Sequence, residues 1–154
     1  MGVIEDKLGR LGISLPEAAK PVANYVPFVI SGKLVFVAGQ IPVAQGKPQF
    51  VGQLGADVSL EDAVAAARLC AINILSQLKV ACGGDLERVR RVVKLVGFVN
   101  CGPCFSDIPK VVNGASDLMV EVFGEAGKHA RSAVGAASLP LGVPVEVEAI
   151  VEMF

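Results

Sequence analysis

Two glutamates and an arginine near the C-terminus are the residues best suited to chemistry on a small anion. Glu146 and Glu148 stand two residues apart in an apolar stretch, Val145 to Val151, that is typical of a strand. Residues at i and i+2 share one face of a strand, so both carboxylates project together. We expect Arg131 on the neighbouring strand, where a guanidinium can hold a carboxylate while a glutamate orients or deprotonates water. A solvated edge or an ion pair is the alternative interpretation.

The segment Cys101-Gly102-Pro103-Cys104 resembles the redox motif of thioredoxin and falls between an expected strand and an expected helix. A reactive cysteine in such proteins is activated at the helix N-terminus. Here the helix is expected to begin at Asp107, beyond both thiols, and the chain has no Trp. We therefore interpret the segment as a Gly-Pro turn. Cys70 and Cys82 fall in or near a helix, so no four-ligand zinc site is expected.

His129 is the single histidine of the chain. It could act as a general base, but no nucleophile signature stands beside it, and a structural hydrogen bond is the favoured interpretation. The glycines at positions 52, 55, 83 and 84 do not form a phosphate-binding pattern and are interpreted as loop and cap residues.

Apolar periodicity predicts the elements that must position these residues, in the order helix, two strands, helix, strand, helix, two strands. Their expected ranges are 3–13, 26–30, 34–38, 63–80, 89–99, a helix from Asp107, 132–137 and 145–151. Ser59 with Asp62 resembles a capping box, and Gly83-Gly84 should end the long helix. Gln45-Gly46-Lys47-Pro48 is expected to be a loop. This order favours an α+β fold with the helices on one face of a single sheet.

The composition narrows the class of protein. The 154 residues carry a net charge of −1, without the clustered Lys and Arg of a nucleic-acid surface. Although 53% of residues are apolar, the best candidate span, Ala63 to Leu78, is interrupted by polar residues, so no membrane partner is expected. The apolar excess and the uncovered sheet face instead favour an oligomer. The N-terminus lacks the pattern of a signal peptide, which favours a cytoplasmic location with reduced cysteines.

Several of these segments together resemble the reactive intermediate deaminase (Rid) family, many of whose members carry the older name endoribonuclease L-PSP. The C-terminal signature is His129-Ala-Arg-Ser-Ala-Val-Gly135, then Leu139-Pro140, then Pro144-Val-Glu-Val-Glu-Ala-Ile150. Upstream, the similar segments are Asn24-Tyr25, Leu34-Val-Phe-Val-Ala-Gly-Gln-Ile-Pro42, Val111-Val-Asn113 and Phe123-Gly124. The resemblance covers nearly all of the chain after about residue 20, and the helical extension over 1–20 is similar to one bacterial branch of the family.

The resemblance implies a chorismate-mutase-like α+β fold over 1–154, with one sheet, two main helices on one face and a short N-terminal helix. It implies a homotrimer with clefts at the subunit boundaries. The implied activity is hydrolysis of enamines and imines, such as 2-aminoacrylate and 2-iminopropanoate, to 2-keto acids and ammonia, without cofactor or metal. The arginine that binds the substrate carboxylate falls on Arg131 and the glutamate beside the attacking water on Glu146. The pocket positions fall on Tyr25, Gly39 and Asn113.

One departure leaves a second hypothesis open. The family often has a cysteine two residues after the arginine, and here that residue is Ala133. Since an imine carbon is already electrophilic, the site has mainly to fix the carboxylate, position water and move protons. The alternative function is a trimer that binds a keto acid or another small metabolite without turnover. RNA cleavage and thiol redox chemistry are weaker hypotheses.

Overall fold

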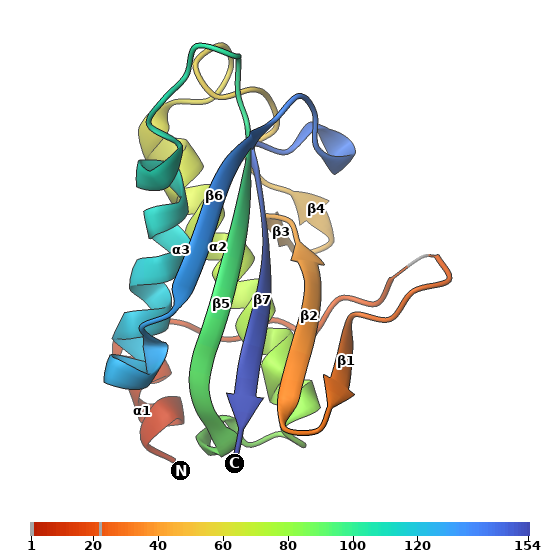
Figure 1. Ribbon diagram of the computed structural model, residues 1–154, viewed down its shortest axis with the longest axis vertical. Helices are drawn as coiled ribbons and strands as arrows, with labels where there is room; N and C mark the ends of the chain where they lie inside the picture. The colour runs from red at the N-terminus through yellow and green to blue at the C-terminus, as the bar shows by residue number, and fades with distance from the viewer. Residues whose placement is uncertain (1, 22) are drawn as a thin grey trace.

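A five-stranded sheet carries the long helices on one of its faces (Figure 1). The computed structural model describes residues 2–21 and 23–154. In chain order the elements are α1 (Val3–Arg10), β1 (Phe28–Ser31), β2 (Leu34–Gln40), β3 (Val43–Ala44), β4 (Lys47–Pro48), α2 (Leu60–Ala81), η1 (Leu86–Arg88), β5 (Val89–Asn100), α3 (Ile108–Phe123), η2 (Gly124–Gly127), β6 (Ala130–Ala136), η3 (Pro140–Gly142) and β7 (Val145–Met153). The α-helices and the strands of this sheet follow the predicted order.

The sheet is mixed, with the strand order β1-β2-β7-β5-β6. Strands β5 and β6 pair in parallel, and α3 provides the crossover between them. The other neighbours in the sheet are antiparallel. A small second sheet of β3 and β4 replaces part of the expected loop at Gln45-Gly46-Lys47-Pro48, which was therefore predicted incorrectly. Strands of two residues are too short to show an alternating pattern.

Both predicted ends of the long helix α2 are confirmed. The Ser59 hydroxyl accepts a hydrogen bond from the backbone N–H of Asp62 at 3.1 Å. At the other end, Gly83 and Gly84 have φ angles of 69° and 96°, a left-handed conformation that glycine adopts without steric cost. Helix α2 is long and apolar enough to cross a membrane by length and composition alone. Its apolar content is explained by burial, because Ile74, Leu75 and Leu78 are all fully inaccessible.

Helix α3 begins at the predicted position but without the predicted cap. Asp107 occupies the N-cap position, yet its side chain makes no capping hydrogen bond because its backbone, at φ −85° and ψ 28°, is not extended. The carboxylate instead lies 3.5 Å from Lys110 Nζ. Further along, Gly114 crosses α2 so closely that a side-chain carbon there would overlap the carbonyl oxygen of Val64. The absence of a side chain at this glycine allows the two helices to reach their packing distance.

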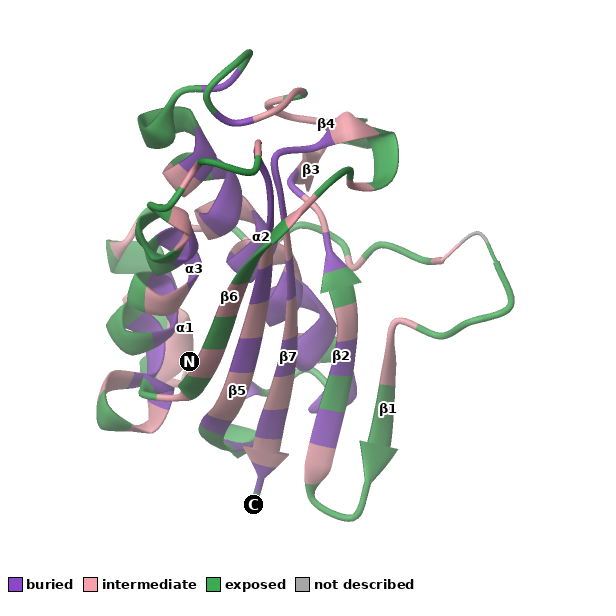
Figure 2. Ribbon diagram, turned by 45° about the horizontal axis from the view of Figure 1, so that its top comes forward, coloured by how far each residue is buried: buried purple, intermediate pink, exposed green. Residues whose placement is uncertain are grey.

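The helices cover one face of the sheet and leave the other open (Figure 2). Burial along β7 alternates strictly, with Val145, Val147 and Val151 fully inaccessible on the helix side. On the opposite side, Val29 is 52% exposed and Phe36 is 41% exposed. An apolar sheet face in contact with water is the feature that a second layer of protein normally covers.

The N-terminal extension is fixed to the helix layer. Leu8 of α1 is buried, and the Glu5 carboxylate lies 3.1 Å from Lys79 Nζ on α2. Further along, Gln77 Nε2, itself buried, donates to the backbone oxygen of Ala19 at 2.8 Å. Residues 23–27, which lead into β1, project away from the body (Figure 1). Tyr25 lies on this projecting segment and is 56% exposed.

Candidate functional site

Glu146 lies on the open side of β7, at the end of the sheet where β2 is irregular. The pairing of β2 with β7 shifts between Val37 and Gln40, and Gly39 lies within this shift. The Glu146 carboxylate fills the space beside Gly39, so that any side chain at Gly39 would overlap it. Burial, followed by the negative charge of Glu148, raises the pKa of Glu146. A half-buried carboxylate with a raised pKa is suited to accept and return a proton.

Tyr25 and Gly39 line the same hollow. It has a volume of about 190 Å³ and also includes Ala38 and Lys20. Gly39 therefore lies beside Glu146 and shares this hollow with Tyr25, while the pocket role that the resemblance implies for Tyr25 and Gly39 stays a prediction. Together they form a first half-site, defined as Tyr25, Gly39 and Glu146, which presents a carboxylate and a phenol but no guanidinium.

Arg131 belongs to a second half-site, formed with Asn113 and Ser116. Its Nη1 donates to Asn113 Oδ1 at 2.7 Å and to Ser116 Oγ at 3.2 Å. Asn113 and Ser116 are three residues apart on α3, so they lie on the same face of that helix and point at the edge strand β6. Asn113 was predicted from the sequence, whereas Ser116 was missed. A serine within a helix carries no sequence signal until its partner is known.

His129 has the structural hydrogen bonds that the sequence favoured. Its Nδ1 lies 2.6 Å from the backbone oxygen of Gly127 and its Nε2 lies 2.9 Å from Ser116 Oγ. Ser116 therefore joins His129 to Arg131, although nothing in their spacing along the sequence connects them.

The expectation that Arg131 and Glu146 lie near each other on neighbouring strands is wrong for a single chain. Strand β5 lies between β6 and β7, and its Leu95 pairs with Arg131 while its Phe98 pairs with Glu146. Leu95 is buried under the helices and Phe98 is on the other side, so the guanidinium and the carboxylate leave opposite faces of the sheet. The parallel crossover through α3 places β6 beside β5. Strands β6 and β7 are therefore not neighbours in the sheet, although they follow each other along the chain.

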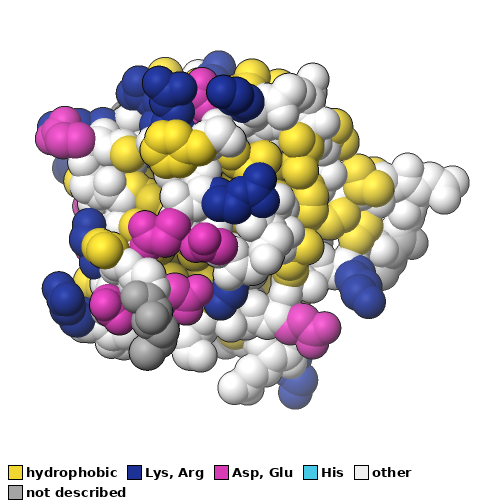
Figure 3. All heavy atoms as spheres, turned by 90° about the horizontal axis from the view of Figure 1, so that it is seen from below, with side chains coloured by type: hydrophobic (Ala, Val, Ile, Leu, Met, Phe, Trp, Pro, Cys, Tyr) yellow, Lys and Arg dark blue, Asp and Glu magenta, His cyan; other side chains and the backbone are white. Residues whose placement is uncertain are grey.

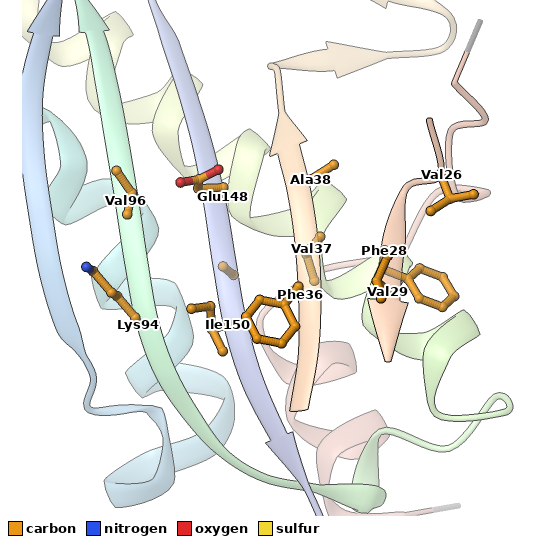
Figure 4. A pocket seen from close by; sticks show the side chains of 11 residues that line it. Val26, Phe28, Val29, Phe36, Val37, Ala38, Lys94, Val96, Glu148 and Ile150 are labelled. Carbon is orange, nitrogen blue, oxygen red and sulfur yellow. The ribbon is translucent and has the colours of Figure 1, made fainter. Parts of the chain in front are cut away.

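The open face has a hollow of its own, of about 370 Å³, over β1, β2, β7 and β5 (Figure 4). The charged residues of its lining are Lys94 and Glu148, which Figure 4 shows on the same side of the sheet among apolar side chains such as Phe36 and Ile150. Neither Arg131 nor Glu146 lines it. Lys94 was not predicted as a site residue, because a lysine between apolar residues of a strand carries little other signal.

The cysteines of the Cys101-Gly102-Pro103-Cys104 segment differ in environment. Cys101 is buried and Cys104 is exposed, and α3 begins only at Ile108. Burial raises the pKa of the Cys101 thiol, which opposes formation of the reactive thiolate. Within residues 2–21 and 23–154, no group of three or more His, Cys, Asp or Glu side chains is placed to hold a metal ion.

Charges of both signs are interspersed on the end of the molecule shown in Figure 3, where neither sign forms an extended field. Some of the charged side chains pair with one another, for example Arg90 with Glu152 at 3.5 Å and Arg68 with Glu121 at 3.2 Å. On this end of the molecule, the described side chains do not form the basic stripe expected where a protein contacts a phosphate backbone.

Residues 5–153 match the family described as "YjgF/chorismate mutase-like, putative endoribonuclease". Protein TCP17 of Trypanosoma cruzi is 51% identical over 99% of this chain and 95% of its own length. The 2-iminobutanoate/2-iminopropanoate deaminase of Dermatophagoides farinae is 30% identical over 90% of this chain and 93% of its own length.

Solved structures share the fold. Atu1372 of Agrobacterium tumefaciens, a protein of unknown function, is 53% identical with a TM-score of 0.93, over 99% of this chain and 93% of that one. Escherichia coli TdcF, whose crystal structure contains bound serine, is 26% identical with a TM-score of 0.65, over 90% of this chain and 94% of that one. The chorismate-mutase-like α+β fold expected from the sequence is confirmed.

Proposed function

Since the chain belongs to the YjgF/chorismate mutase-like family, we propose that it hydrolyses small carboxylate-bearing imines and enamines, such as 2-iminopropanoate and 2-aminoacrylate, to 2-keto acids and ammonia. The observation that carries the proposal is the fixed guanidinium of Arg131. Its Nη1 is held by Asn113 and Ser116 while the rest of the group stays available for a carboxylate. The deaminase of Dermatophagoides farinae, 30% identical to this chain, supports the reaction class.

Glu146 supplies the proton transfers. In the reaction, water adds to the carbon of the protonated imine while Glu146 takes one of the water protons. The resulting tetrahedral carbon bears –OH and –NH2. The nitrogen then receives the proton from Glu146 and leaves as ammonia. As the C=O bond of the keto acid forms, the hydroxyl proton passes to the Glu146 carboxylate, and its transfer to ammonia gives ammonium and restores the carboxylate. Because burial and Glu148 raise the pKa of Glu146, one carboxyl group can accept and then donate the proton.

Ala133 is compatible with this chemistry. It follows Arg131 by two residues on the same face of β6, pairing with Gly97 of β5. A thiol there would not be required, since water is the nucleophile and no covalent intermediate with the protein is formed.

The complete site requires two copies of the chain. Within one chain, Arg131 and Glu146 leave opposite faces of the sheet, so the two half-sites can meet only across an interface. The open apolar face, with Phe36 and Val29 exposed, provides a surface for such contact. We propose the homotrimer implied by the family resemblance, with each cleft built from the Arg131 half-site of one copy and the Glu146 half-site of the next. Light scattering coupled to size-exclusion chromatography should give three times the 15.9 kDa chain mass, and a monomer would contradict this arrangement.

Catalysis is tested by mixing the purified protein with 2-iminopropanoate formed in situ by an amino-acid oxidase. The protein should accelerate loss of the imine and release of ammonia relative to buffer. Equal rates with and without the protein would reject the proposed reaction. A matched incubation with RNA should show no cleavage, because the single histidine has both ring nitrogens bonded within the fold.

Binding without turnover is the second candidate function. It is favoured by Ala133 and by TdcF, a fold relative whose structure contains serine. Calorimetry with pyruvate or 2-oxobutanoate separates the two functions, since binding without imine hydrolysis would support the second and exclude the first.

Replacing Glu146 with glutamine should lower kcat for 2-iminopropanoate by about 100-fold or more, since the general base is lost. The folded chain holds the Glu146 proton more tightly than the unfolded chain, so ionisation costs stability above the folded pKa. The Glu146→Gln variant should therefore be more stable than the wild type near pH 7 and lose this advantage below about pH 4.

Urea titrations at both pH values measure that difference. Glu152→Gln is the matched control, since it changes the same residue type on the same face of β7 but outside the half-site. Wild-type turnover by the Glu146→Gln variant would show that Glu146 is not required for the reaction.

A further inference from the structure

For the neutral imidazole of His129, the surrounding hydrogen bonds assign the protons in a hydrogen-bonded chain that ends at Arg131. The backbone oxygen of Gly127 can only accept, so Nδ1 of the imidazole, 2.6 Å away, must carry a proton. In the neutral ring, Nε2 is then an acceptor, and Ser116 Oγ at 2.9 Å is the donor. The single hydroxyl proton of Ser116 is thereby directed at the histidine.

As a result, both protons on Nη1 of the Arg131 guanidinium are engaged in hydrogen bonds. Because the Ser116 proton points at His129, the lone pairs of its Oγ are free to accept from Nη1 of Arg131 at 3.2 Å. The other Nη1 proton goes to Asn113 Oδ1 at 2.7 Å. Nη1 has two protons, and both are now engaged. In the described ranges 2–21 and 23–154, Nη1 is the donor in every hydrogen bond of this guanidinium. The edge formed by Nε and Nη2 therefore remains able to donate to a ligand.

The remaining edge has the shape of a carboxylate receptor. Nε and Nη2 carry parallel N–H bonds that match the two oxygens of a carboxylate. Arg131 lies on β6, the outermost strand of the sheet, where a long side chain would otherwise sample many rotamers. Anchoring through Nη1 removes that freedom before a ligand arrives, which is how preorganisation raises affinity.

We propose that His129 and Ser116 are positioning residues, which hold Arg131 so that its Nε–Nη2 edge faces a ligand carboxylate. This inference rests on the proposed function only in naming a 2-keto acid or its imine as the ligand. Ser116 acts on the guanidinium directly, and His129 acts through Ser116 by dictating which way the hydroxyl proton points. Neither residue touches the reacting atoms.

The single histidine makes the first test unambiguous. In a 15N-labelled sample, every imidazole signal comes from His129. Near pH 8 the ring should show the Nδ1–H form, with Nε2 at the chemical shift of a hydrogen-bonded acceptor. The Nε2–H form, or a ring averaging between both forms, would overturn the proposal.

The second test uses the Arg131 side chain itself and needs no ligand. The 15Nε relaxation of Arg131 should report a restricted side chain in the wild type and a mobile one in Ser116→Ala. The Ser116→Thr variant keeps the hydroxyl and should restore the restriction. An Arg131 side chain equally ordered in Ser116→Ala would overturn the proposal whether or not the protein is an enzyme.

The third test measures ligand affinity and turnover. Ser116→Ala should raise the Kd for pyruvate, and the KM for 2-iminopropanoate, about fivefold to tenfold, while kcat stays within about twofold. Ser116→Thr should recover the wild-type Kd. A parallel loss of kcat, or an unchanged Kd, would contradict a positioning role. If Arg131 loosens in Ser116→Ala but wild-type protein hydrolyses no imine, the positioning role stands and the proposed reaction fails.

Discussion

Replacing Arg131 with alanine should lower kcat/KM for 2-iminopropanoate by about 100-fold or more. Each charge-assisted hydrogen bond to a carboxylate contributes about 1.5–3 kcal/mol, and the Nε–Nη2 edge offers two of them. The loss should be accompanied by weaker binding of pyruvate, since the product carries the same carboxylate as the imine. Steady-state kinetics and calorimetry on the same samples measure both.

The control for this variant is Arg68→Ala. Arg68 is also an arginine that bonds to α3, through Glu121 at 3.2 Å, but the pair is exposed on the outer surface of the helix layer. Exposed ion pairs contribute little, so activity and stability should change hardly at all. Arg131→Lys distinguishes charge from shape, because lysine keeps the positive charge without the planar fork, and it should recover only a small part of the activity. A wild-type value of kcat/KM for the Arg131→Ala variant would show that the guanidinium does not bind the substrate.

Replacing Gly114 with alanine should destabilise the fold by about 2–4 kcal/mol. The new methyl group would overlap the Val64 carbonyl oxygen, which belongs to the backbone of α2 and cannot move aside as a flexible side chain would. Relief requires α2 and α3 to separate, and this disrupts the packing of both helices against the sheet. Urea unfolding at one fixed protein concentration measures the change.

The same substitution at Gly9 is the matched control. Gly9 also lies in a helix, but a side-chain carbon there would meet nothing within 4 Å. Alanine has the higher helix propensity, so Gly9→Ala should leave stability unchanged or raise it by up to about 1 kcal/mol. Equal losses at both positions would show that the close approach at Gly114 is not what limits the packing.

Local signals were sufficient to predict most of the elements. Ser59 with Asp62 marked the beginning of α2, and Gly83 with Gly84 marked its end, because caps depend on residues only a few positions apart. The alternation of Val with Glu along β7 predicted which face is buried. The short strands β3 and β4 carry too few residues for any such pattern.

The sequence named candidate site residues but did not predict how they are arranged in one chain. Glu146 and Gly39 do lie together, because β2 and β7 are neighbours in the sheet. Arg131 does not join them, since strand pairing is decided by the crossover through α3 rather than by closeness along the chain. Ser116 was missed because its importance comes from its two partners, His129 and Arg131, which the sequence does not connect with it.

The separation of Arg131 and Glu146 onto opposite faces has a genetic consequence. In the proposed ring, each copy lends its guanidinium to one cleft and its carboxylate to the next. A copy that assembles but has lost both groups would silence the two clefts that flank it, although its neighbours are intact. Alleles of that kind should be dominant over the wild type, whereas alleles that prevent folding, and so keep the chain out of the ring, should be recessive.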